Sequence, residues 1–205
     1  MNEPAIRIEE QIISLFPDRE TLICRGWVLK RMERQLLVYP LYYKFSEGDI
    51  PENIRRCEEI SRQCGAGCVF RIVGHTNYYL SSILTDNGYG LEKCGVVGEW
   101  NLTGDAGKLC MKEKVQGGLF LKNGNSGTGY VMVGESVIGI KRQGLLLLPD
   151  GNLPDTGLED ILRFSVENGI VRILADIPGK EELPEQYGRP GFRRAYFYRC
   201  YQRED

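Results

Sequence analysis

Seven cysteines and a single histidine are the residues of this chain best suited to metal binding or nucleophilic catalysis. A structural zinc site needs four such ligands, usually with two cysteines in a CxxC pair. Cys64 and Cys68 are four residues apart, no CxxC pair occurs, and His75 stands alone. A cysteine hydrolase would need a thiol beside that histidine and a third group to orient it, and the spacing favours no such arrangement. We therefore expect no metal, and mainly free thiols as in the reducing cytosol.

A glycine-rich segment and two glutamates are further residues whose type suggests chemistry. Residues 124–129 read Gly-Asn-Ser-Gly-Thr-Gly, but a phosphate-binding P-loop ends in Gly-Lys-Ser or Gly-Lys-Thr and opens a helix. The strand-like run Tyr130–Val133 follows instead, so we interpret the segment as a hairpin turn. Glu99 and Glu135 could accept a proton from a substrate, although such glutamates are more often solvated surface groups.

Aromatic side chains concentrate in the first half of the chain. They could line a pocket for an acceptor molecule, or they could pack a core and its rim. The residues concerned are Tyr39, Tyr42, Tyr43, Phe45, Tyr78 and Tyr79. Ordinary aromatic usage favours packing, and both interpretations stay open at this point.

Composition limits the kind of protein to which these residues belong. The chain has 205 residues, 42% of them hydrophobic and 26% charged, enough for one large domain or two small ones with a substantial core. Apolar runs such as Leu145–Leu148 are far shorter than the ~20 residues of a membrane span. The net charge of −2 argues against nucleic-acid binding. Because no secretory signal is recognisable, we expect a cytoplasmic protein without membrane or nucleic-acid partners.

Hydrophobic spacing predicts alternating helices and strands. Pro51 and Gly65–Gly67 bracket one helix, and Gly88 and Gly169 end two others. The predicted helices span residues 3–16, 52–63, 77–87, 157–168 and 181–187. The predicted strands span residues 21–29, 35–45, 68–73, 96–102, 118–122, 130–133, 137–141, 143–148, 170–175 and 195–201. The strand at 143–148 has no polar face after Gly144, which is typical of a central strand covered on both sides.

The two halves of the chain end in the same pattern. Each half ends with a strand, a helix, a short segment in which glycine precedes an aromatic residue, and a last strand. The short segment is Asn87-Gly88-Tyr89 in the first half and Pro190-Gly191-Phe192 in the second. The polar, glycine-bearing stretch Thr103–Lys114 resembles a linker between them. We therefore predict an α/β (α+β) fold of two tandem copies, with domains at residues 1–105 and 106–205, each a mixed central sheet flanked by helices.

These patterns resemble the GCN5-related N-acetyltransferase (GNAT) superfamily. Residues 187–192 carry the Tyr-x-x-x-Gly-Phe spacing that closes the GNAT fold, and Tyr196–Arg199 is similar to the aromatic strand that follows it. The run Arg25-Gly26-Trp27-Val28-Leu29 resembles the opening strand of tandem GNAT proteins, in which a degenerate first copy precedes a cofactor-binding second copy. The resemblance covers nearly the whole chain.

The resemblance implies an N-acetyltransferase that moves an acyl group from acetyl-CoA to a small-molecule amine, here unidentified. It implies a splayed central strand at 145–148 along the pantetheine arm and a pyrophosphate loop at 149–157. The expected cofactor-binding residues are Leu147, Leu148, Gly151, Asn152 and Gly157. Tyr187 matches the tyrosine that protonates the leaving thiolate, because a phenol of pKa ~10 can donate to a thiolate of pKa ~8.5. The resemblance does not name the general base.

The loop at 149–157 also supports a rival function. It carries Asp150 and Asp155 but no arginine, and Pro154 lacks an N–H group for a phosphate. The alternative is a catalytically inactive GNAT-fold module with a binding or regulatory role that has lost acyl-CoA binding. A third alternative is a homodimer in which another subunit completes the site.

Overall fold

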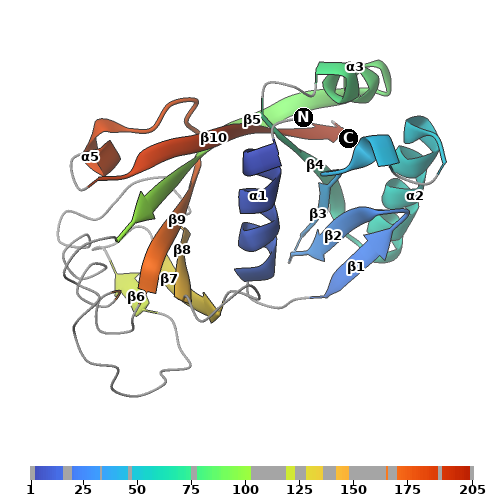
Figure 1. Ribbon diagram of the computed structural model, residues 1–205. Helices are drawn as coiled ribbons and strands as arrows, with labels where there is room; N and C mark the ends of the chain where they lie inside the picture. The colour runs from blue at the N-terminus through green and yellow to red at the C-terminus, as the bar shows by residue number, and fades with distance from the viewer. Residues whose placement is uncertain are drawn as a thin grey trace. The chain divides into compact units, whose positions relative to one another are not determined.

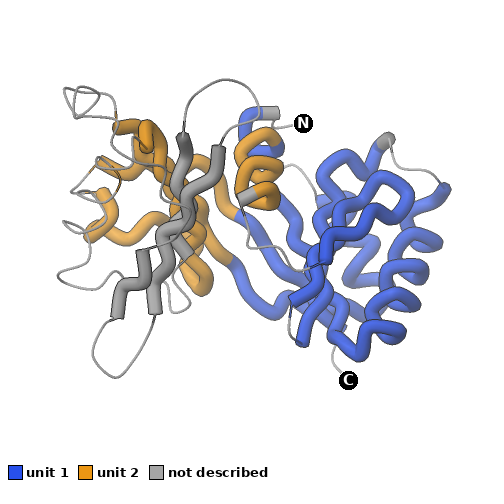
Figure 2. The backbone as a smooth tube through the Cα atoms, turned by 90° about the horizontal axis from the view of Figure 1, so that it is seen from below, with its two compact units in different colours: residues 1–6, 17–94, 198–205 blue, residues 7–16, 95–197 orange. Residues whose placement is uncertain are grey.

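The structure is a computed structural model that describes residues 3–15, 20–32, 34–45, 48–74, 78–102, 119–122, 128–135, 142–147, 165, 170–188 and 191–203. The chain divides into two compact units (Figure 2). Unit 1 comprises residues 1–6, 17–94 and 198–205, and unit 2 comprises residues 7–16 and 95–197. Each unit combines helices with a sheet of parallel and antiparallel strands (Figure 1), which confirms the predicted mixed α/β class.

Unit 1 holds most of the first half of the chain. Its elements are β1 (Thr21–Cys24), β2 (Trp27–Arg31), β3 (Gln35–Tyr39), the short 3-10 helix η1 (Tyr43–Phe45), α2 (Ile50–Gln63), β4 (Gly67–Val73) and α3 (Tyr78–Asp86). Unit 2 holds β6 (Leu119–Lys122), β7 (Thr128–Glu135), β8 (Arg142–Leu147), β9 (Ile170–Pro178) and α5 (Glu185–Gly188). Three elements contribute to both units, namely α1 (Glu3–Leu15), β5 (Tyr89–Asn101) and β10 (Arg193–Arg203).

The predicted strand at 21–29 is wrong, because it is a hairpin of β1 and β2. Arg25 and Gly26 have φ angles of 49° and 84°, and Cys24 pairs with Trp27 across the turn. Two successive positive φ values form a two-residue turn whose twist matches that of the flanking strands. The predicted strand at 35–45 also stops early, at Tyr39, where Pro40 follows and has no N–H to donate.

Helix α2 confirms the predicted helix at 52–63 and begins two residues earlier, at Ile50. The Asp49 carboxylate caps it by accepting a hydrogen bond of 2.6 Å from the Glu52 N–H. Pro51 lies in the first turn, where its missing N–H costs no hydrogen bond.

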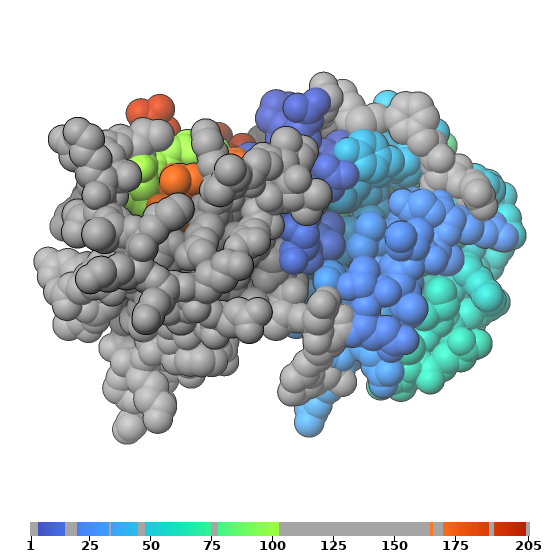
Figure 3. Space-filling view, turned by 60° about the horizontal axis from the view of Figure 1, so that its bottom comes forward, coloured from blue at the N-terminus to red at the C-terminus, as the bar shows by residue number. Residues whose placement is uncertain are grey.

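Helices α2 and α3 cover one face of the strands of unit 1, and their apolar side chains meet the strands in a core. The rings of Trp27 and Tyr89 each pack edge to face with the ring of Phe70. The centroid of the Phe70 ring lies 6.1 Å from that of Trp27 and 5.0 Å from that of Tyr89. Aliphatic residues from β3, α2 and α3 surround them, among them Leu36, Ile54 and Leu84. The face of unit 1 drawn in Figure 3 exposes the β1–β2 hairpin and α2.

The strands of the two units pair in the same sequence of orientations. Unit 1 has the order β1-β2-β3-β4-β10 and unit 2 the order β6-β7-β8-β9-β5. In both, two antiparallel pairs are followed by a parallel pair, β3 with β4 or β8 with β9, and then by an antiparallel one. The last strand of each order belongs to the other half of the sequence. Residues 198–202 of β10 pair with β4, and residues 95–101 of β5 pair with β9.

Several sequence predictions fall outside the described residues. They are the strand at 137–141, the helix at 157–168 except for Ser165, the linker at 103–114 and the domain boundary after residue 105. Apart from the predicted strand at 21–29, the other predicted helices and strands recur as described elements with shifted ends. In the part of the chain that the structure describes, no helix is long and apolar enough to span a membrane.

Candidate functional site

The parallel strands β8 and β9 end at the same level in unit 2. Leu147 is the last residue of β8, and it lies in register with Asp176 near the end of β9. Ligands of open α/β sheets bind outside the carboxyl ends of parallel strands, so this edge is the natural candidate site. Of the predicted cofactor-binding residues, only Leu147 is described. The remaining ones, Leu148, Gly151, Asn152 and Gly157, lie outside the described residues.

Tyr187, the predicted proton donor, lies in the short helix α5 and is fully buried. Its ring meets the edge of Phe192 with centroids 5.7 Å apart, and it joins the apolar core of unit 2. Burial raises the pKa of the Tyr187 phenol above its ordinary value of 10. The hydroxyl is therefore protonated at neutral pH, as a proton donor must be.

The face of β9 that turns away from Tyr187 carries polar groups. Side chains alternate between the two faces of a strand. Ile173, Ala175 and Ile177 belong to the core around Tyr187. Arg172 and Asp176 consequently lie on the opposite face, where the aspartate is only 7% exposed.

An ion-pair network on this face joins β9, β5 and α1. Arg172 Nε lies 2.7 Å from Glu99 Oε1, and Arg172 Nη1 donates to Gln11 Oε1 at 2.8 Å. Asn101 Nδ2 donates to the same Glu99 oxygen at 3.2 Å. Glu99, considered above as a proton acceptor, is thus held by a guanidinium and an amide.

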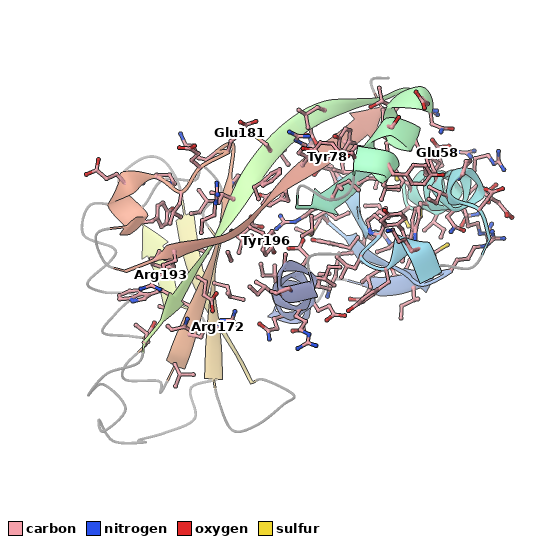
Figure 4. The ribbon with its side chains drawn as sticks, turned by 45° about the horizontal axis from the view of Figure 1, so that its top comes forward. Glu58, Tyr78, Arg172, Glu181, Arg193 and Tyr196 are labelled. Atoms are coloured by element: carbon pink, nitrogen blue, oxygen red, sulfur yellow. The ribbon has the colours of Figure 1, made fainter. Side chains whose placement is uncertain are left out.

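A second contact fixes α1 against the beginning of β10. The Tyr196 hydroxyl donates a hydrogen bond to the Glu9 carboxylate, and both side chains are buried. Figure 4 labels Tyr196 on β10 beside α1 and Arg172 on β9. This bond and the one from Arg172 to Gln11 place the middle of α1 on the polar face of unit 2.

Sequence reasoning did not single out Arg172, Asp176 or Glu9, which lie on or against this polar face. The predicted strand at 170–175 ended before Asp176, whereas β9 continues to Pro178. A charged residue at the end of an otherwise apolar strand was the available signal. No signal in the sequence marked Glu9, because its spacing in a helix with other acidic residues is typical of a solvated face.

The described cysteines are free thiols. They are Cys24, Cys57, Cys64, Cys68, Cys94 and Cys200. Burial raises the pKa of Cys57, and it raises that of Cys68 to about 12, so neither is an effective nucleophile near neutral pH. His75 and Cys110 lie outside the described residues. Within the described ranges, no group of His, Cys, Asp and Glu could hold a metal ion.

The aromatic residues of the first half divide between core and surface of unit 1. Tyr39 and Tyr43 are buried, whereas Tyr42, Tyr78 and Tyr79 are exposed. Burial and the nearby Tyr79 raise the pKa of Tyr43. The side chain of Phe45 is outside the described residues.

The fold is similar to that of solved GNAT proteins. A GCN5-related N-acetyltransferase from Kribbella flavida matches with a TM-score of 0.55 and 10% identity, over 98% of this chain and 96% of its own. A second one, from Sphaerobacter thermophilus, matches with a TM-score of 0.51 and 13% identity, over 87% and 76% of the two chains. No family model and no curated protein sequence matches this chain. At such identities the likeness establishes a GNAT-type fold and nothing finer.

Proposed function

We propose that this protein is a GNAT-type N-acetyltransferase that transfers an acyl group from acetyl-CoA to an amine. The observation that carries the proposal is the GNAT fold shared along 98% of the chain with the Kribbella flavida protein. The Tyr-x-x-x-Gly-Phe segment supports it, because Tyr187 and Phe192 pack together in the core of unit 2. The matching order of strand pairings supports a tandem arrangement of two GNAT-like copies.

Acetyl-CoA would bind where β8 ends. β8 stays paired with β9 as far as Leu147, so a gap between strands for the pantetheine arm would begin at Leu148. The implied splaying at 145–148 is therefore absent from the described part of β8. The main-chain N–H groups of Gly151, Asn152 and Gly157 are the proposed contacts of the pyrophosphate.

The proposed reaction is direct attack of a neutral amine on the thioester carbonyl carbon. A carbon–nitrogen bond forms, main-chain N–H groups of β8 stabilise the oxyanion, and the carbon–sulfur bond breaks. Tyr187 donates its proton to the leaving thiolate. The raised pKa of the buried phenol keeps it protonated before the transfer, and it also makes Tyr187 a weaker acid than a solvated phenol.

The rival proposal is a binding module that uses the GNAT scaffold without acyl transfer. Two observations favour it, the aspartates and Pro154 of the loop at 149–157 and the full burial of Tyr187. Two carboxylates close to a pyrophosphate weaken its binding by about 1 kcal/mol or more each, even when screened.

Calorimetric titration with acetyl-CoA and with free coenzyme A, at low and moderate salt, separates the two proposals. We expect micromolar binding that weakens with salt, and loss of turnover in Tyr187→Phe with binding retained. The phenylalanine keeps the ring that packs on Phe192, and thermal unfolding checks that the variant stays folded. No heat up to millimolar ligand from a folded sample would overturn the acetyltransferase.

A further inference from the structure

Three thiols from three elements meet in the core of unit 1. Cys24 is the last residue of β1, Cys57 lies in the middle of α2, and Cys68 lies near the start of β4. All three belong to one cluster of packed side chains or lie against it. Burial raises the pKa of Cys57 most, and the nearby Cys68 and Cys24 thiols raise it further. The fold therefore brings together three sulfur atoms that the sequence keeps apart.

Hydrogen bonding distinguishes two of these thiols from the third. The Cys57 thiol is hydrogen-bonded to Cys24. Cys68 is hydrogen-bonded to Tyr89 instead, and the Tyr89 hydroxyl also donates to Glu58 Oε1 at 2.8 Å. A hydrogen bond between two thiols places their sulfur atoms in contact, and a disulfide closes that contact to about 2 Å. Cys24 and Cys57 are therefore the better placed pair for a disulfide.

The two thiols of this pair differ in their access to solvent. Cys57 is fully buried, whereas Cys24 is 8% exposed and lies beside the turn that joins β1 to β2. Among the described strands β1 pairs with β2 alone, whereas β4 pairs on both sides, with β3 and with β10. A strand held on one side moves more easily than one held on both. A small oxidant consequently reaches Cys24 first, and β1 can shift to let the sulfur atoms close.

We propose that Cys24 and Cys57 form an oxidation site at which a hydroperoxide converts the two thiols into a disulfide. The Cys24 thiolate attacks one peroxide oxygen, the oxygen–oxygen bond breaks, and Cys24 becomes a sulfenic acid while the other oxygen leaves as water or alcohol. The Cys57 sulfur then attacks the Cys24 sulfur, Cys57 loses its proton, and a water leaves. Two thiols are oxidised and one hydroperoxide is reduced. This site is independent of the acyl transfer proposed above.

The surroundings of Cys57 set the pace and the effect of the reaction. Its raised pKa leaves little thiolate, so the second step is slow, over minutes to hours, although contact with Cys24 removes the need for a collision. The new bond would tie β1 to α2 and close a loop over residues 24–57 in the unfolded chain. Such a loop restricts the unfolded chain, so the oxidised protein should unfold at a higher temperature.

The test uses the full chain in its reduced form. It is treated with hydrogen peroxide at low protein concentration, which disfavours bonds between chains, and is then unfolded in iodoacetamide to block the remaining thiols. Trypsin cleaves after arginine, which places Cys24 on residues 20–25, Cys57 on residues 57–62 and Cys68 on a third peptide. Mass spectrometry of the unreduced digest therefore identifies which two cysteines are joined.

We expect peptides 20–25 and 57–62 to be joined in most chains within about an hour at millimolar peroxide, and in few untreated chains. Dithiothreitol should separate them. Treatment should raise the unfolding temperature of wild type by about 5 °C and leave that of Cys24→Ala without this rise. Cys64→Ser is the matched control, because it removes a more exposed thiol at the end of the same helix. The joined peptides should persist in it.

Several results would overturn the proposal. One is a treated wild-type protein in which Cys24 and Cys57 are both still blocked by iodoacetamide. Another is a digest in which Cys57 is joined to Cys68 in place of Cys24. Loss of the joined peptides from a folded Cys64→Ser would count equally against it. A lower unfolding temperature after treatment would show that the fold does not accommodate the bond. The wild-type digest decides the pairing even where Cys24→Ala fails to fold.

Discussion

Among single residues, burial decides which ionisable groups of this protein can react. The Cys57 and Cys68 thiols and the Tyr187 phenol have raised pKa values because their charged forms would lose hydration. The two thiols therefore behave as small apolar side chains of the core. The same effect keeps the Tyr187 hydroxyl protonated at neutral pH and makes it a weaker acid than a solvated phenol. Glu52 shows the opposite shift at the surface. Hydrogen bonding from Arg25, and then its positive charge, lower the pKa of the Glu52 carboxyl.

The Glu52 shift makes a testable contribution to stability as pH changes. A carboxyl whose pKa is lower in the folded state stabilises the fold above its unfolded pKa, here about 4.5, and loses that contribution as pH falls through the folded pKa. We therefore expect Glu52→Gln to unfold at a lower temperature than wild type at pH 7. The difference should shrink below about pH 4.5, where Glu52 is increasingly protonated. Thermal melts across this range test it, and an equal gap at pH 3 and pH 7 would contradict it.

Among the elements, the turn from α5 to β10 explains why a glycine precedes Phe192. Gly191 has a φ of +117°, and a Cβ there would meet Trp100 Nε1 at 2.9 Å. The turn is closed by the Phe192 N–H, which donates to the Tyr187 carbonyl at 3.1 Å. Phe192 can then pack on both Tyr187 and Trp100. The Gly-Phe part of the motif thus positions Tyr187 through the packing of the Phe192 ring.

Gly191→Ala should therefore destabilise unit 2 through both backbone strain and overpacking. The matched control is Gly179→Ala, since Gly179 has a φ of +74° and nothing within 4 Å of an added Cβ. The control should show the strain alone, about 1–2 kcal/mol. Gly191→Ala should cost about 1–3 kcal/mol more, because Trp100 must move and because a φ of +117° lies farther from the left-handed region that alanine can adopt. Urea denaturation measures both variants, and equal losses would show that Trp100 yields without cost.

In the whole molecule, each unit is completed by a strand from the other half of the sequence. Residues 198–202 of β10 pair with β4 of unit 1. There Tyr201 enters the core and the Arg71 guanidinium lies 3.4 Å from the Tyr198 ring centroid. Residues 95–101 of β5 pair with β9 of unit 2 in return. Neither half of the sequence therefore contains all the strands of its own unit.

Deleting residues 198–205 should consequently destabilise unit 1, although residues 17–94 remain unchanged. β4 would lose its hydrogen-bonding partner on one side, since β3 stays paired on the other, and the β4 amides that face β10 should exchange with solvent at least tenfold faster, as measured by hydrogen–deuterium exchange. Arg203→Ala is the control, because it loses the surface contacts with Glu58 and Asn87 while β10 stays in place. Full protection of β4 in the truncated chain would contradict the strand exchange as the source of its stability.

Local signals in the sequence account for the elements that were predicted well. Pro51 and Gly65–Gly67 mark the ends of α2, and the apolar run after Gly67 marks β4. Helix capping, proline geometry and hydrophobic patterning can be recognised in the sequence because each acts over a few neighbouring residues. The Arg25-Gly26 turn was missed because it depends on two positive φ values, and arginine is not a residue that signals one.

The sequence by itself determined the mixed α/β class and the repeated strand–helix–strand ending, since each follows from neighbouring residues. The resemblance of residues 187–192 to the GNAT motif suggested Tyr187 as a proton donor. Only the tertiary structure decided that Asp176 stands level with Leu147, that Arg172 holds Glu99, and that each unit takes its last strand from the other half. Such partners are distant along the chain. Strand register and burial bring them together, and these depend on how the whole chain packs rather than on local preference.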